Sequence, residues 1–307
     1  MDSVELVEEI PQKGFWSEKE KELFEVYGNR GYKISFVLGE TGCFTIYSKK
    51  LNKETIGGMG FLHAPEEKEE FFAMLEFMED WFSHQGVKRY FAPMDFNTWH
   101  TYRIPSSNPE NPLFPGEMDY PFHINEWLKE WGMKVVKKYY SYVVDEFEGV
   151  LRYLKPGMKR GKKEGLRIEE GKKDIKTMEI VYKISCEAFK KAFLFEKIPF
   201  QEFIAMHSEE KNNSLLFIAW LDNQPAGFIF GYPWGNTLIE KTVAVLPEYR
   251  NRFTGTLLIY QMYLAGLEMG CKRFIHAFMR ESISTHIFSR RFGRIYRVYS
   301  LYEKELK

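Results

Sequence analysis

One stretch constrains the fold more than any other, residues 242–258, which read Thr-Val-Ala-Val-Leu-Pro-Glu-Tyr-Arg-Asn-Arg-Phe-Thr-Gly-Thr-Leu-Leu. A β-branched run ends at Pro247, a basic turn follows, and a helix is predicted to begin at Thr254 or the next residue. The first amides of that helix lack partners within it and lie next in sequence to Arg250 and Arg252. Free amides and positive charge at one point favour an anion such as phosphate or pyrophosphate.

Charge and composition exclude several classes of partner. The chain carries 43 basic and 43 acidic residues, whereas a dedicated nucleic-acid binder would show a basic excess. No apolar run approaches the roughly 20 residues of a membrane span, and the acidic first residues do not resemble a secretory signal. The three widely spaced cysteines, Cys43, Cys186 and Cys271, form neither a metal-binding pattern nor a closed disulfide set. We therefore expect a cytoplasmic protein without metal, nucleic acid or membrane as a partner.

Hydrophobic patterns along the chain indicate an α/β fold. Alternating and β-branched runs predict strands, and apolar residues at helical spacing predict helices. In the first half we expect strands at 33–38, 43–47, 55–62, 87–92 and 135–145, and helices at 66–85 and 124–131. In the second half we expect strands at 166–168, 215–220, 226–232, 238–245, 272–279 and 294–302, and helices at 175–193, 202–207, 254–269 and 282–292.

Two segments interrupt this pattern and divide the chain. Prolines recur between residues 93 and 122, which predicts a long loop of the kind that often forms a functional lid. Residues 155–165 have the glycine-containing, basic composition of a linker. We therefore predict domains at residues 1–150 and 166–307, joined by a linker at 151–165.

The two halves also resemble each other. Gly86-Val-Lys-Arg-Tyr-Phe-Ala parallels Gly270-Cys-Lys-Arg-Phe-Ile-His, and each segment follows a helix that begins shortly after Pro65 or Pro247. The shared order of elements indicates a duplication. After Pro65, however, the first copy has four glutamates and lacks the glycine of the second. Because those carboxylates repel a pyrophosphate, we expect the anion site only in the second half.

The order of elements in the second half resembles the GNAT N-acetyltransferase superfamily. Val245-Leu-Pro247 matches the strand end in the family's signature, Arg250 and Gly255 match its phosphate turn, and Phe253 replaces the first glycine of that turn. The resemblance implies two GNAT-like domains in tandem, each with a mostly antiparallel central sheet flanked by helices. It is fainter in the first half, which we interpret as a degenerate copy.

The resemblance also implies which residues bind acetyl-CoA, the acyl donor of that family. Its turn amides hold the pyrophosphate, and the strand before the turn pairs with the pantetheine. The corresponding strand residues here are Val243, Ala244 and Val245. The corresponding turn and helix residues are Arg250, Asn251, Arg252, Phe253, Thr254, Gly255 and Thr256, and Ser282 is a further donor contact.

Candidate catalytic residues are fewer. The family's tyrosine acid corresponds to Ser289, and a serine hydroxyl is a poor proton donor, so the usual acid is absent or supplied from elsewhere. Transfer to an ammonium group also needs a base. Glu240 and His276, on neighbouring expected strands, are the candidates. The alternative for either residue is a hydrogen-bonded structural role.

The leading hypothesis is an acetyl-CoA-dependent N-acyltransferase, in which a small-molecule or peptide amine attacks the thioester directly. A CoA-binding or protein-interaction module of the same fold is the alternative, because Phe253, Ser282 and Ser289 depart from the family pattern. An aminoacyl-tRNA-dependent ligase would need more basic surface than residues 155–163 offer.

Overall fold

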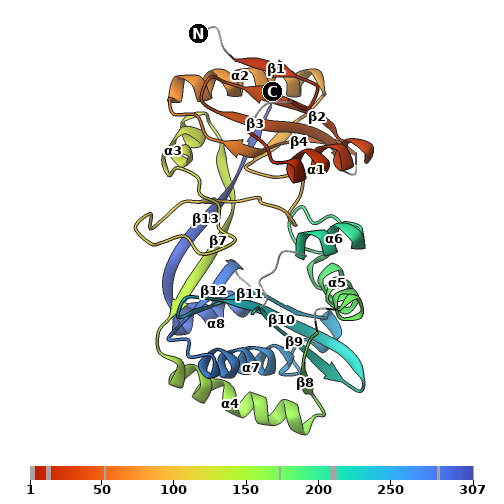
Figure 1. The fold of residues 1–307 in the computed structure, drawn as a ribbon, viewed down its shortest axis with the longest axis vertical. Helices are drawn as coiled ribbons and strands as arrows, with labels where there is room; N and C mark the ends of the chain where they lie inside the picture. Colours follow the sequence, from red (N-terminus) through yellow and green to blue (C-terminus); the bar gives the residue numbers. More distant parts are fainter. Residues whose placement is uncertain are drawn as a thin grey trace. The chain divides into compact units, whose positions relative to one another are not determined.

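The protein is described by a computed structural model that covers residues 4–11, 15–51, 53–172, 174–207, 213–281 and 284–306. The chain forms two compact units (Figure 1). Unit 1 comprises Met1–Lys138 and Val298–Lys307, and unit 2 comprises Tyr139–Arg297. The boundaries between the units fall inside strands β7 (Lys134–Val144) and β13 (Arg294–Glu305).

Unit 1 is built on a mixed sheet in the order β1-β2-β3-β4-β5-β13. Its other strands are β1 (Glu5–Val7), β2 (Lys33–Leu38), β3 (Cys43–Leu51), β4 (Glu54–His63), β5 (Arg89–Ala92) and the short β6 (Ile104–Pro105), which pairs with β13. Strands β4 and β5 are parallel, and the other pairs in the sheet are antiparallel.

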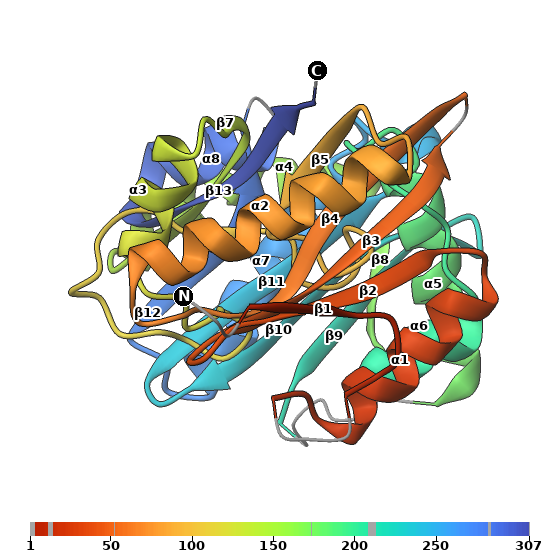
Figure 2. The same cartoon turned by 90° about the horizontal axis from the view of Figure 1, so that it is seen from above.

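Both faces of this sheet are covered because its strands are apolar on both sides. Alternate residues face opposite ways along a strand, so Phe36 packs with helix α1 (Glu18–Asn29), whereas Val37 packs with helix α2 (Lys68–His84). Figure 2 shows α2 lying across the strands. Helix α3 (His123–Glu130) packs in the same core as α2, so one face of unit 1 carries two helices.

In unit 2 the strand order continues from β13 as β13-β7-β12-β11-β10-β9-β8, and these strands are here called the second sheet. Its strands are β8 (Arg167–Glu170), β9 (Leu215–Leu221), β10 (Gln224–Trp234), β11 (Thr237–Val245) and β12 (Arg273–Arg280), with parts of β7 and β13. Strands β11 and β12 are parallel, and the neighbours of that pair are antiparallel.

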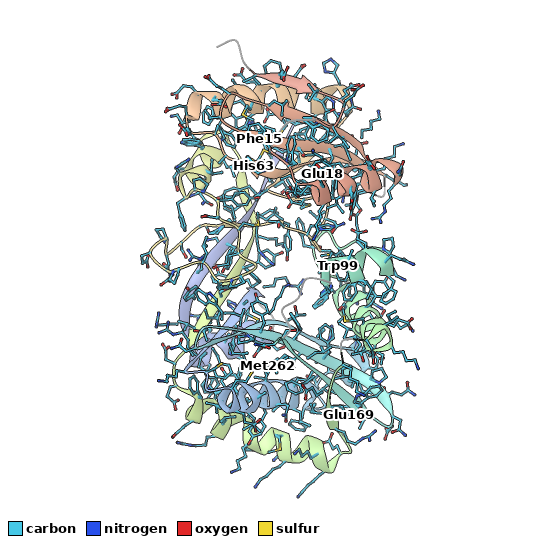
Figure 3. All side chains as sticks on the ribbon, viewed as in Figure 1. Phe15, Glu18, His63, Trp99, Glu169 and Met262 are labelled. Carbon is cyan, nitrogen blue, oxygen red and sulfur yellow. The ribbon has the colours of Figure 1, made fainter. Side chains whose placement is uncertain are left out.

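Helices cover both faces of the second sheet as well (Figure 1). Helix α7 (Thr254–Glu268) and helix α4 (Phe147–Lys163) form a core with one face, and α8 (Ser284–Phe292) borders it. Helices α5 (Ile175–Phe189) and α6 (Phe200–His207) lie on the other face. Met262 of α7 points to the strands (Figure 3), where a Cβ on Gly231 would come within 3.3 Å of its methyl carbon. Gly231 therefore allows α7 to approach the sheet closely.

The segment expected to be a linker, residues 151–165, instead lies almost entirely within α4. The helix forms because Val150, Leu154 and Gly161 make a buried stripe against α7. Pro156 lies inside it with an exposed side chain and removes one helical hydrogen bond. Tertiary packing outweighs the linker-like composition here.

The final strand also departs from the expected division into residues 1–150 and 166–307. The end of β13 belongs to unit 1, where Tyr302 lies opposite Ala92 of β5 and its ring is buried in the core beneath α2. Pairing along an otherwise open sheet edge is the physical reason, because it satisfies main-chain groups that β5 would leave free. Among the described residues, no helix is long and apolar enough to cross a membrane.

Candidate functional site

The two parallel strands of unit 2 separate part-way along their length. Strands β11 and β12 pair over only four positions, and the last pair is Glu240 with His276. Beyond it β11 continues to Val245, paired with β10 on one side. A bulge leaves Lys241 as an extra residue on β11. Residues 241–245 therefore have a main-chain edge, here called the open edge, with which no strand among the described residues pairs on the β12 side.

The open edge leads into a turn whose amides are unused. After a 3-10 turn (Pro247–Tyr249), α7 begins at Thr254 with no side-chain cap. Within the described part of the chain, the amides of residues 251–256 donate to no main-chain carbonyl. Thr254 Oγ1 donates to Tyr249 O at 3.1 Å and holds the turn against the helix. These six amides, here called the amide cradle, form an anion site of the kind found at helix N-termini.

The cradle depends on left-handed backbone at two residues that are not glycine. Asn251 has φ 64°, and Phe253, the residue before the helix, has φ 62°. Asparagine tolerates this conformation, whereas it is unusual for a bulky residue. The Phe253 ring packs on α4, where a Cβ on Gly157 would lie 3.1 Å from Phe253 Cδ1. That packing accounts for the retention of a residue that is strained in the position of the family's glycine.

The two arginines of the turn have different surroundings. The Arg250 guanidinium donates to Val245 O at 3.4 Å and to Ala188 O at 3.2 Å, which ties the end of β11 to the end of α5. Arg252 is exposed, and the described residues offer it no hydrogen bond or ion pair. Arg252 therefore remains available to an anion at the cradle.

Four polar side chains are buried where the strands separate, beneath α7 and α8. Tyr263 Oη lies 2.8 Å from His276 Nε2, and His276 Nδ1 lies 2.8 Å from Ser289 Oγ. Glu240 Oε2 lies 3.9 Å from His276 Nε2, beyond hydrogen-bond distance, and has no hydrogen-bond partner in the described part of the chain. We call Glu240, Tyr263, His276 and Ser289 the polar cluster.

Burial controls protonation in the polar cluster. It raises the pKa of Glu240 to about 8 and lowers the pKa of His276 to about 4, because each charged form would lose its hydration. Burial, and then the neighbouring Glu240 charge, raise the pKa of Tyr263 well above its usual value. Near pH 7 the cluster is thus largely neutral, and the contact between His276 and Glu240 is not an ion pair.

The structure brings together most of the residues that the sequence singled out. Val243, Ala244 and Val245 lie on the open edge, and residues 250–256 form the turn and cradle. Ser282 lies outside the described residues. Tyr263 was not anticipated, because in the sequence it is one ring in an apolar helix, and only its buried hydroxyl beside His276 reveals its part. The described residues contain no cluster that could hold a metal ion.

The corresponding place in unit 1 is filled by the chain itself. Strands β4 and β5 separate after Gly58 and Phe91. There Met94 N donates to Met59 O at 2.7 Å, and the Asp95 carboxylate accepts from Phe61 N at 2.6 Å. The edge that is open in β11 is therefore occupied in β4.

The helix start in unit 1 is also unsuited to an anion. Helix α2 carries Glu69 and Glu70 in its first turn. The Glu70 carboxylate accepts from Thr41 N at 2.8 Å and from Gly42 N at 3.1 Å. The first turn of α2 thus carries two carboxylates, one of which binds the turn between β2 and β3, and this negative charge disfavours an anion at the helix start.

Comparison with known proteins agrees with this geometry. Residues 178–293 match the acetyltransferase (GNAT) family, a segment that contains the open edge, the cradle and the polar cluster. The matched segment belongs to the GNAT superfamily. Membership of this family indicates that the protein is an acyltransferase. No curated protein matches the sequence.

Two solved structures with a similar fold align with this chain over most of the length of both proteins. A tandem GNAT protein from the clavulanic acid biosynthesis pathway is 11% identical, with TM-score 0.51, over 89% of this chain and 82% of that one. A GCN5-related N-acetyltransferase from Sphaerobacter thermophilus is 12% identical, with TM-score 0.51, over 99% and 96%.

A third similar structure is larger. A fungal multi-domain GH3 β-N-acetylglucosaminidase with a glucosamine N-acetyltransferase region is 10% identical, with TM-score 0.59, over 98% of this chain, which spans 38% of that protein. At these identities the likeness concerns the fold. The predicted fold class, two tandem GNAT-like α/β units with mostly antiparallel sheets, is confirmed.

Proposed function

We propose that this GNAT protein is an acetyl-CoA-dependent N-acyltransferase whose donor site lies in unit 2. The observation that carries the proposal is the open edge of β11 leading directly into the amide cradle of α7. An edge of free main-chain groups suits the amides of a pantetheine arm, and the cradle suits a pyrophosphate. Both features are required at once by a CoA thioester.

In this proposal each part of the site has a separate task. The amides of residues 251–256 and the side chain of Arg252 bind the pyrophosphate, while Val243, Ala244 and Val245 pair with the pantetheine. The thioester then reaches the end of the paired region, beside Glu240 and His276. A main-chain amide of β11 polarises the carbonyl, and an amine of a small molecule or peptide attacks it.

Isothermal titration with acetyl-CoA tests donor binding. We expect saturable binding by the wild-type protein and a loss of at least tenfold in affinity in Arg252→Glu, because the variant places negative charge at the cradle. Lys272→Glu is the matched control, since Lys272 is exposed and precedes β12, whereas the cradle follows β11. Absent binding at millimolar acetyl-CoA, or unchanged binding in Arg250→Glu/Arg252→Glu, would contradict the proposal.

A second candidate function keeps the donor site but omits transfer, as in a CoA-binding module. Ser289 supports it, because a serine stands where the family has its tyrosine acid and its hydroxyl is buried against His276. Release of free thiol from acetyl-CoA, measured with polyamines, amino acids, amino sugars and a lysine peptide, separates the two. Tight binding without thiol release from any of these would favour the binding module.

A further inference from the structure

Helix α4 presents a row of cations on the face opposite its buried stripe. Figure 1 shows the helix on the outer side of α7. Its six exposed cations are Arg152, Lys155, Lys159, Arg160, Lys162 and Lys163. Four of them, at positions 152, 155, 159 and 163, follow one another at intervals of three or four residues and therefore share one face. The only acidic residue of the helix is Glu148, in its first turn.

These cations are not neutralised by the protein. No ion pair or side-chain hydrogen bond joins any of the six to another residue in the part of the chain that the structure describes. Elsewhere in the same unit, Arg273 and Arg294 both bind the Asp145 carboxylate. The long side chains of the outer face of α4 extend away from the unit (Figure 3).

Helix stability accounts for part of this row only. The helix dipole favours the three cations of the last turn. Arg152, Lys155 and Lys159 lie before that turn, where like charges three or four residues apart destabilise a helix by about 0.2–0.5 kcal/mol per pair. The fold therefore gives no reason for these three cations.

The basic surface continues from α4 onto α8. The Arg291 guanidinium lies over the ring of Tyr153, 4.5 Å from its centroid, and Arg290 beside it is exposed. The six cations of α4 together with Arg290 and Arg291 are here called the basic face.

The basic face belongs to a unit with an excess of positive charge. Unit 2 contains 25 basic and 18 acidic residues, and unit 1 contains 18 basic and 25 acidic residues, which together give the 43 of each kind in the chain. The balanced composition that argues against a nucleic-acid partner thus conceals one basic unit. Such asymmetry is typical of chains that bind a polyanion through one part.

We propose that the basic face binds the phosphodiester backbone of a nucleic acid helix. The inference is independent of the proposed function. From Arg152 to Lys163 the row is about 16 Å long, and each strand of a duplex carries about one phosphate per 3.4 Å. The row therefore matches about five phosphates of one strand. Contacts to phosphate alone do not read the base sequence.

Magnitudes favour phosphates over the carboxylates of a protein partner. An exposed ion pair between side chains contributes about 0.2–1 kcal/mol, which is little against the roughly 4–15 kcal/mol that association costs. A nucleic acid helix instead releases condensed counterions when cations neutralise its phosphates.

A lipid surface suits this helix less well. Helices that lie on membranes insert an apolar face, whereas the apolar stripe of α4 is already buried against α7. The one large hydrophobic side chain exposed on α4, which is described throughout its length, is Tyr153, and Arg291 covers its ring.

Fluorescence anisotropy with a labelled RNA duplex, and with the DNA duplex of the same sequence, tests the proposal. We expect a Kd of about 10⁻⁴–10⁻⁶ M at physiological salt, and a plot of log Kobs against log salt concentration with a slope of about −4 to −5. Binding of either duplex supports the proposal, and the tighter one identifies the source of the phosphates.

Lys159→Gln/Lys163→Gln should weaken duplex binding at least tenfold and reduce the magnitude of the slope by about 2, because two phosphate contacts are lost. Lys176→Gln/Lys183→Gln is the matched control. It removes the same charge from unit 2 at exposed positions of α5, on the other face of the sheet, and should change the Kd less than threefold. Thermal melting should be unchanged in both variants.

Three results would overturn the inference. The first is equal duplex binding by the wild type and Lys159→Gln/Lys163→Gln. The second is loss of duplex binding in Arg252→Glu alone, which would place the phosphates at the amide cradle. The third is tighter binding to phosphatidylserine vesicles than to either duplex at the same salt concentration. Acetyl-CoA titration of the same α4 variant should change less than threefold, so the failure of one proposal leaves the other standing.

Discussion

Glu240 shows at the scale of one residue how burial sets chemistry. It stands on a β-strand beside a neutral imidazole, and its Oε2 has no hydrogen-bond partner among the described residues. Desolvation therefore dominates, and the proton is retained far above the usual range of a glutamic acid. Phe253 shows the same dependence on surroundings, since packing on α4 keeps it in a backbone conformation that favours glycine.

The raised pKa of Glu240 makes the free energy of unfolding depend on pH. The folded state keeps this proton up to about pH 8, whereas the unfolded chain releases it near 4.5. Between these values the folded state binds more protons, so the contribution of Glu240 to stability falls as pH rises and is constant above pH 8. A shift of this size corresponds to about 5 kcal/mol at about 1.4 kcal/mol per pKa unit.

Urea unfolding of Glu240→Gln at pH 5 and pH 8.5 measures this effect. We expect the free energy of unfolding of the variant, relative to wild type, to increase by a few kcal/mol between the two pH values, because glutamine carries no titrating charge. Glu248→Gln, at an exposed position, is the control and should show no such change. Equal differences at both pH values would mean that Glu240 is ionised in the folded protein.

At the scale of secondary structure, the packing of helix α4 against α7 supports the amide cradle. They run antiparallel, since Gly161 lies against Leu257 near the start of α7, whereas the Phe147 ring is 6.5 Å from that of Tyr263 further along it. Gly157 and Gly161 are spaced one helical turn apart on the contact face. They let the backbone of α4 come close to Phe253 and thereby hold the cradle in place.

Gly161→Ala tests this contact. A Cβ there would lie 2.5 Å from Leu257 Cδ1 and 3.1 Å from Phe253 Cβ, so α4 or α7 must shift. We expect a loss of about 1–3 kcal/mol in stability and weaker acetyl-CoA binding, measured by thermal melting and titration. Gly28→Ala in α1 is the control, because a Cβ at Gly28 meets nothing within 4 Å. This substitution should stabilise the protein slightly. Unchanged acetyl-CoA binding in Gly161→Ala would show that the packing of α4 does not affect the cradle.

At the scale of the whole molecule, the two units share an architecture but differ where a ligand would bind. Each has a parallel strand pair that separates after a few residues, at Glu240 and His276 in unit 2 and at Gly58 and Phe91 in unit 1. In unit 1 the segment containing Asp95 completes the hydrogen bonds of the free edge. This difference in occupation, rather than in fold, supports the proposal that the donor binds in unit 2 alone.

Native mass spectrometry with acetyl-CoA should therefore show one bound donor per chain. A second equivalent would have to displace main-chain and carboxylate hydrogen bonds that are already formed in unit 1. Arg250→Glu/Arg252→Glu should lose the single bound donor, which places it in unit 2. A second donor that persists in this variant would show that unit 1 also binds.

Much of the fold followed from local pattern. Apolar periodicity predicted most helices and strands, and the order around residues 242–258 was enough to suggest the family, which is confirmed. The segments that follow Gly86 and Gly270 form β5 and β12, and each of these strands is parallel to the strand that precedes it in the chain. Such features can be predicted because helix and strand periods are properties of neighbouring residues.

The sequence by itself determined the basic turn with free amides, the duplication and the types of the main elements. Only the tertiary structure decided that most of residues 151–165 form a helix, that the end of β13 completes unit 1 and that Phe253 adopts positive φ. It also decided that His276 contacts both Tyr263 and Ser289. These outcomes depend on contacts between residues far apart in the chain. Their free energy comes from packing and desolvation, which a local pattern does not contain.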